Sequence, residues 1–158
     1  MANYCATSDV ERHLSRYLKP VGGSFSDDTT PSKTEVDGLI ADIYGEINAT
    51  LSGAGVSPVP PTNATALAAL RLYNALGAAA LSASIMLGMG GEAAVKYAEQ
   101  LQKQYEDRLS MIARGEGVAA VLLSASTTAS VISNYTEGDF VENDDGTQKR
   151  SFTKGQVW

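Results

Sequence analysis

Apolar residues recur at steps of three and four through most of the first 115 positions, the spacing that places side chains on one face of an α-helix. The clearest series lies in the second of four such segments: Val36, Leu39, Ile40, Ile43, Ile47 and Leu51. A similar series marks the fourth segment, about residues 92–114: Ala94, Tyr97, Leu101, Tyr105, Leu109 and Ile112. The pattern predicts four helices that share one core, with Tyr97, Leu101 and Tyr105 as core residues.

Capping signals set the predicted bounds of these helices. The pattern Ser8-Asp9-Val10-Glu11 is a capping box that opens a short helix ending near Leu18, and Ser32-Lys33-Thr34-Glu35 opens the second helix. Asn63 is the expected cap of the third helix, which runs to about Leu87. Glycines end the helices, at Gly53 and Gly55 and again at Gly115 and Gly117.

The third segment is rich in alanine. Arg71 is the single charged residue between Val56 and Gly91. Small side chains around most of a helix let neighbouring backbones approach, which predicts either the centre of a bundle or a helix packed between subunits. A helix crossing a membrane needs about 20 mainly apolar residues. Asn74, Ser82, Ser84 and Arg71 interrupt this segment, so we expect it to be buried in protein.

Residues 116–158 differ from the helical pattern, being rich in Ser, Thr, Gly and β-branched residues. Asn143-Asp144-Asp145-Gly146 separates two β-prone runs, which predicts a β-hairpin. An isolated hairpin is marginal in water, so we expect this one to order against another chain. The predicted fold is all-α: a four-helix bundle-like body, residues 1–115, with an extended C-terminal tail, residues 116–158, for assembly contacts.

Charge and motifs exclude several functional classes. The formal net charge of −6 argues against a protein that grips nucleic acid, which needs a clustered basic face. Cys5 is the sole cysteine, so an internal disulfide is excluded and an inert thiol is expected. His13, between Arg12 and Arg16, is expected on the solvated surface. We therefore predict no catalytic, cofactor-binding or metal-binding residues and no enzyme activity.

Two motifs that superficially suggest ligands have simpler interpretations. The pair Asp27-Asp28 lacks the spaced oxygen ligands of a calcium loop and precedes a helix, whose N-terminus favours carboxylates. The segment Gly88-Met89-Gly90-Gly91 lacks the Lys-Ser/Thr ending of a phosphate-binding loop. The start of the chain also lacks the basic and apolar regions of a signal peptide, so no secretion is expected.

Several short strings, in their order along the helices, resemble the head–tail connector adaptor proteins of tailed double-stranded DNA bacteriophages. The resemblance covers about residues 4–115 and rests on these strings: Ala6-Thr7-Ser8-Asp9-Val10-Glu11, Phe25-Ser26, Pro31-Ser32-Lys33-Thr34-Glu35-Val36-Asp37-Gly38-Leu39-Ile40, Glu46-Ile47-Asn48-Ala49-Thr50-Leu51 and Gly55-Val56. It implies a virion protein, made in the host cytoplasm, that forms a ring, usually dodecameric, beneath the portal. The implied partners are the portal protein, neighbouring adaptor subunits, a tail or stopper protein, and DNA passing through the lumen without specific binding.

Two groups of residues are candidates for this role. Aromatic and aliphatic residues of the tail are expected to anchor it in the portal or a neighbouring subunit, because buried aromatic anchors dominate interface energies: Phe140, Val141, Phe152, Val157 and Trp158. Acidic residues of the second helix are expected on the wall of the DNA channel: Glu35, Asp42 and Glu46. The alternative functions are a small helical phage protein that binds nucleic acid for packaging or regulation, and a helical domain with a disordered tail.

Overall fold

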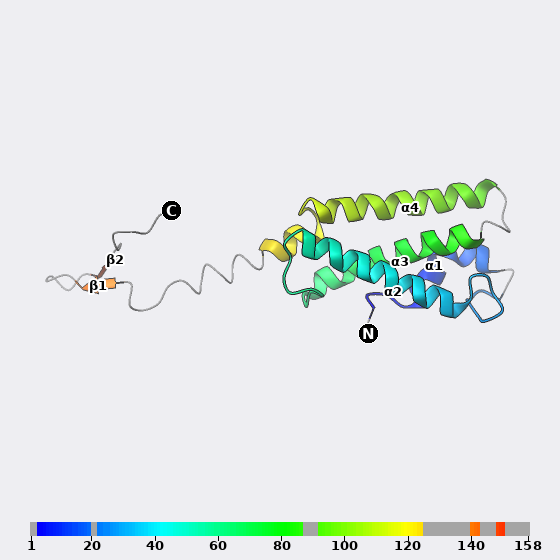
Figure 1. The fold of residues 1–158 in the computed structure, drawn as a ribbon, viewed down its shortest axis with the longest axis horizontal. Helices are drawn as coiled ribbons and strands as arrows, with labels where there is room; N and C mark the ends of the chain where they lie inside the picture. The colour runs from blue at the N-terminus through cyan, green and yellow to red at the C-terminus, as the bar shows by residue number, and fades with distance from the viewer. Residues whose placement is uncertain (1–2, 20–21, 87–91, 125–139, 143–147, 151–158) are drawn as a thin grey trace. The chain divides into compact units, whose positions relative to one another are not determined.

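In the computed structural model, the described residues are 3–19, 22–86, 92–124, 140–142 and 148–150. They fall into two compact units, Met1–Leu123 and Ser124–Trp158. The first unit contains four helices: α1 (Thr7–Leu18), α2 (Lys33–Gly53), α3 (Ala64–Met86) and α4 (Glu92–Ala113). The all-helical body that the sequence predicts is therefore confirmed for the described part of this unit (Figure 1).

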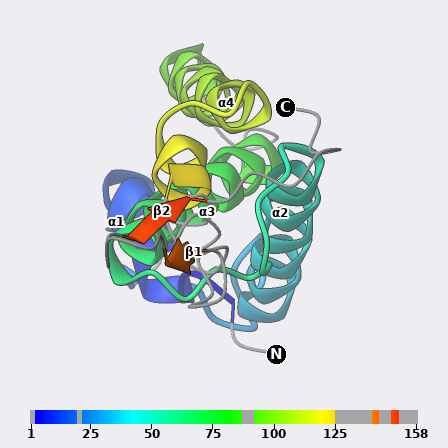
Figure 2. The same ribbon diagram turned by 90° about the vertical axis from the view of Figure 1, so that its left-hand side faces the viewer.

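Helix α3 is the centre of the body and packs against each of the other three helices (Figure 2). Every residue from Tyr73 to Ala80 is buried, so this alanine-rich part of α3 is covered on all of its faces. Gly77 marks the tightest approach: a Cβ at this position would lie 3.0 Å from both Ile43 of α2 and the ring of Tyr105 of α4. Of the two predicted arrangements for this segment, the structure has the bundle centre.

The predicted start of α2 and the predicted start of α3 are both confirmed. The Ser32 hydroxyl accepts the Glu35 amide N–H at 3.3 Å, and the Glu35 carboxylate accepts the Ser32 amide N–H at 2.7 Å. At the start of α3 the Asn63 side-chain oxygen accepts the Ala66 amide N–H at 3.1 Å. These bonds satisfy amide groups that a helix N-terminus otherwise leaves without partners.

The predicted start of α1 is wrong by two residues. The helix begins at Thr7, with Ala6 as its cap, and Ser8 lies inside the first turn. Asp9 replaces the predicted Ser8–Glu11 box, because its carboxylate accepts the Ala6 amide N–H at 3.1 Å. A carboxylate at the third position of a helix can accept the amide N–H of the cap residue, even where the cap residue has no hydroxyl group.

Glycines with positive φ end α2 and α4 in the same way. Gly55 and Gly115 have φ of 84° and 73°. After each, the amide N–H of the next residue donates to a carbonyl five positions earlier: Val56 to Leu51 at 3.0 Å, and Glu116 to Met111 at 2.8 Å. This is the Schellman arrangement, in which glycine avoids the steric cost of left-handed backbone.

The helical unit extends past residue 115, the boundary that the sequence predicts, and ends at Leu123. Residues 118–124 are helical, and Val118 and Ala119 are buried in the core of the body. The turn at Gly117, with φ of 59°, returns this apolar segment to the bundle. Val118 and Ala119 tie this segment to the body because their side chains are covered within the same chain, whereas Val121 is 45% exposed.

The second unit has two short strands, β1 (Phe140–Glu142) and β2 (Gln148–Arg150). They pair antiparallel, with Phe140 opposite Arg150 and Glu142 opposite Gln148. The predicted turn, Asn143-Asp144-Asp145-Gly146, lies outside the described residues.

Candidate functional site

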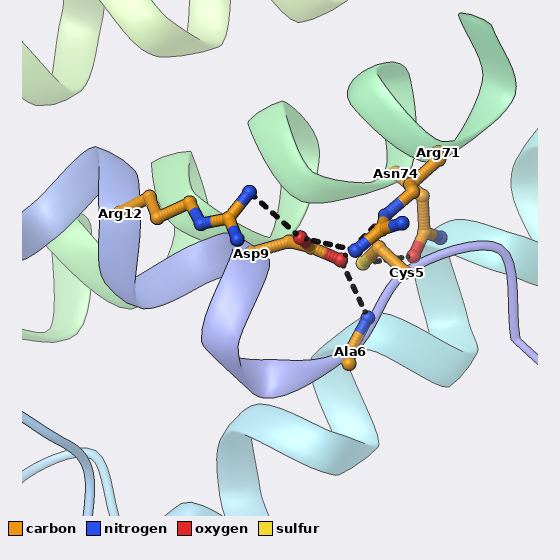
Figure 3. A network of polar contacts seen from close by, with 6 residues as sticks. All are labelled: Cys5, Ala6, Asp9, Arg12, Arg71 and Asn74. Atoms are coloured by element: carbon orange, nitrogen blue, oxygen red, sulfur yellow. Dashed lines mark hydrogen bonds and ion pairs between the residues drawn. The ribbon is translucent and has the colours of Figure 1, made fainter. Parts of the chain in front are cut away.

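An ion pair between a buried carboxylate and an exposed guanidinium joins α1 to the central helix of the bundle (Figure 3). Asp9 is 6% exposed, and its carboxylate accepts two hydrogen bonds from the Arg71 guanidinium, at 2.8 Å and 2.7 Å. Hydrogen bonding from Arg71 is the main reason that the pKa of Asp9 lies below its ordinary value. Arg12 adds a longer contact of 3.7 Å. Asp9 is therefore an ionised structural group with its oxygens occupied.

Cys5 lies beside this pair in a second buried polar contact. Its thiol donates to the Asn74 side-chain oxygen at 2.7 Å, and the Asn74 amide donates to the Ile40 backbone carbonyl at 3.1 Å. Burial, followed by the nearby Asp9 charge, raises the pKa of the Cys5 thiol to about 12. The thiol therefore stays protonated at neutral pH, which agrees with the inert thiol that the sequence predicts.

His13 and the tyrosine series pack between α1 and α4 or in the core of the body. His13, expected on the solvated surface, is partly buried, and burial lowers its pKa. Its backbone carbonyl accepts the Tyr97 hydroxyl at 2.8 Å. Leu101 and Tyr105 are buried and Tyr97 is partly buried, so this series is core, as predicted.

Metal-ligating side chains do not gather anywhere in the described ranges: no group of three or more His, Cys, Asp or Glu is present there. Asp27 and Asp28 are exposed in the loop before α2. The Gly88–Gly91 segment lies outside the described residues.

Three carboxylates form a row along one side of α2, which we call the acidic row: Glu35, Asp42 and Glu46. All three are exposed. Their separations of seven and four residues place them on one side of the helix. Glu35 also closes the α2 capping box, and Glu46 accepts a short hydrogen bond from the Tyr105 hydroxyl. Asp42 has no hydrogen bond or ion pair within the part of the chain described.

The surface beside the acidic row is open. A Cβ added at Gly38, Gly45 or Gly53 would meet nothing within 4 Å. Glycine in a helix interior costs about 1 kcal/mol relative to alanine. Unlike Gly77, these three glycines serve no packing contact within the described body.

The outer face of α1 carries the opposite charge. Arg12, Arg16 and Lys19 are exposed there, and we call them the basic row. The two acidic residues of α1 have hydrogen-bond partners within the chain: Asp9 accepts from Arg71 at 2.7 Å, and Glu11 accepts the Phe25 amide N–H at 3.0 Å. The intervals of four and three residues between Arg12, Arg16 and Lys19 place these side chains on one side of the chain segment, as the intervals of seven and four do for the acidic row.

Helix α3 is the one helix in the described residues that is long and apolar enough to cross a membrane, by length and composition alone. Half of its most apolar window is buried inside the body. The core helix of a globular protein has the same properties, and contacts with α1, α2 and α4 account for its composition.

The tail candidates are described only in part. Phe140 and Val141 lie in β1, whereas Phe152, Val157 and Trp158 lie outside the described residues. Their predicted anchoring role stays a prediction.

Sequence reasoning missed the Asp9–Arg71 pair, whose partners are 62 positions apart. The available signal was Arg71 itself, the single charged residue of an otherwise apolar helix. Comparison of the chain with protein-family models, with curated proteins and with solved structures finds no match.

Proposed function

We propose that this chain is a structural virion protein, an adaptor subunit that forms a ring beneath the portal of a tailed double-stranded DNA phage. The ring joins the DNA-filled head to the tail. The observation that carries the proposal is the resemblance over about residues 4–115, a range that lies within the helical unit Met1–Leu123. The proposed role is structural rather than catalytic. Two of the buried polar residues of the described body, Asp9 and Asn74, support this because their side chains form hydrogen bonds within the chain, to Arg71 and to Cys5.

The proposal assigns four partners: the portal protein, neighbouring adaptor subunits, a tail or stopper protein, and DNA that passes through the lumen without specific binding. The net charge of −6 supports passage without trapping, because DNA is repelled by a negative wall. The acidic row remains the predicted part of that wall. The chain is made in the host cytoplasm and ends in the virion, at the head–tail interface.

The second unit is proposed as the portal-binding segment. A hairpin around β1 and β2 presents its edge and the tail anchors to the portal or a neighbouring subunit: Phe140, Val141, Phe152, Val157 and Trp158. In such contacts a few buried aromatic residues contribute most of the binding free energy.

The test compares the full chain with a chain lacking residues 134–158. The truncated chain keeps the whole helical unit, so its far-ultraviolet circular dichroism should show an unchanged helical fold. Mixed with portal rings of its own phage, the full chain should add mass to the rings and the truncated chain should not. Equal binding by both chains would remove the proposed role of the tail.

A nucleic-acid-binding function is the second candidate, and the basic row of α1 is the observation that favours it. Three cations contacting phosphates predict weak binding with a logarithmic salt slope of roughly −3. Titration of a short DNA duplex with the full chain measures this slope. Tight binding with a steep slope would favour this candidate over the ring.

A further inference from the structure

The charged rows of α1 and α2 have opposite signs, and each is exposed in the described body. We infer that the outer face of α2 binds the outer face of α1 of a second copy of this chain, with the acidic row against the basic row. Complementary charge fixes the register of a contact and speeds encounter.

The spacing of the rows allows the charges to pair simultaneously. Arg12 and Arg16 are four residues apart, as are Asp42 and Glu46. At 1.5 Å rise per residue both intervals are about 6 Å along the helix axis. Arg16 can therefore pair with one acid of α2 while Arg12, whose guanidinium also lies 3.7 Å from Asp9 of its own chain, faces the other. Glu46 retains its second carboxylate oxygen for this contact, since Tyr105 uses only one.

The shape of α2 also suits a neighbouring helix. Gly38 and Gly45 lie in open space beside the acidic row, so no side chain holds a second backbone away at these positions. The close approach shortens the distance between the rows and removes water from the charges, which strengthens their attraction.

The positions of the two faces explain why the contact continues from copy to copy. Helices α1 and α2 lie on opposite sides of α3 in the end-on view (Figure 2). A contact between two different faces is heterologous, and it closes into a ring if the rotation between copies permits. The inference rests on the proposed ring and deepens it by naming the surface between subunits. A row that faces a neighbouring copy does not line the channel, so the two assignments of the acidic row are alternatives, and reciprocal charge reversal decides between them.

Reciprocal charge reversal tests the contact. Arg16→Glu and Asp42→Lys change residues that have no hydrogen bond or ion pair in the described structure, so each chain should fold. Sedimentation of the full-length protein at low salt should show self-association of the parent, and each reversal alone should weaken it at least about tenfold. An equimolar mixture of the two variants should restore it, because opposite rows then face each other. The matched control reversals on α4, Lys103→Glu and Glu99→Lys, should leave it unchanged.

A second variant tests the same face without changing charge. Gly45→Leu adds bulk in open space and removes a helical glycine, so the full-length monomer should be at least as stable as the parent while self-association falls. A parent chain that stays monomeric at low salt up to roughly millimolar concentration, where even weak contacts form, would overturn the inference. So would reversals that associate like the parent, or a mixture no stronger than its components.

The outcomes separate this contact from the proposed function. Portal binding without reciprocal rescue keeps the adaptor role and removes the α1–α2 contact. Reciprocal rescue without portal binding keeps the contact and removes the adaptor role.

Discussion

Replacing two helical glycines by alanine gives opposite expected results because their surroundings differ. At Gly45 an added methyl group meets nothing within 4 Å, whereas at Gly77 it lies 3.0 Å from Ile43 and from the Tyr105 ring. Both substitutions gain helix propensity, about 1 kcal/mol. Only Gly77→Ala adds an overpacking cost, about 1–3 kcal/mol.

The difference between the two variants isolates the packing term, because the propensity gain cancels. Gly45→Ala should be about 1 kcal/mol more stable than the parent. Gly77→Ala should be less stable than Gly45→Ala by about 1–3 kcal/mol. Urea unfolding followed by far-ultraviolet circular dichroism measures both, at low protein concentration and high ionic strength so that self-association does not contribute. Equal stabilisation by both variants would refute the placement of α3 against α2 and α4.

Three further predictions concern polar groups of the body. Arg71 holds the pKa of Asp9 below its ordinary value, so the pair stabilises the fold above the unfolded pKa, and this contribution is lost as pH falls through the folded pKa. Asp9→Asn should therefore unfold with a lower free energy than the parent at neutral pH, and the difference should vanish when urea unfolding is repeated at acid pH. A difference that does not depend on pH would contradict the ion pair. Tyr105→Phe should lower the free energy of unfolding by about 1 kcal/mol because the hydrogen bond to Glu46 is lost. Tyr105→Ala should lower it by about 3–5 kcal/mol because it leaves a cavity in the core. Urea unfolding measures both values, and equal losses would contradict the burial of the ring. Because burial raises the pKa of Cys5 to about 12, the native thiol should react with a disulfide reagent at least about a hundredfold more slowly than the unfolded chain, and equal rates would show an accessible thiolate.

The helices could be predicted from the sequence because their signals are local. Periodicity along 36–51, the Ser32–Glu35 capping box and the Asn63 cap act within one or two turns, and the structure has each of them. The start of α1 could not be placed in this way. Ser8 matched the capping pattern, but the nearby Asp9 satisfies the Ala6 amide instead.

Contacts between distant segments could not be predicted in the same way. The sequence around Asp9 does not identify Arg71 as its partner. The sequence around Gly77 likewise does not identify Ile43 and Tyr105 as its neighbours. The compact helical unit ends at Leu123 rather than at the predicted residue 115, and the contacts that extend it are also between distant segments. The apolar character of residues 116–123 indicated a need for cover, and the structure supplies it from the same chain at Val118 and Ala119.

The candidate surfaces could be predicted only as faces of helices. Seven- and four-residue intervals placed Glu35, Asp42 and Glu46 together, and the structure leaves them exposed. What covers such a face depends on a second molecule, and one chain's sequence periodicity does not specify it.

The adaptor role is tested most directly by weighing portal rings of the same phage before and after addition of the full-length chain. The account predicts a discrete gain in mass equal to a ring of copies, with no gain for the chain lacking residues 134–158. Portal rings whose mass stays constant in saturating full-length chain would contradict it.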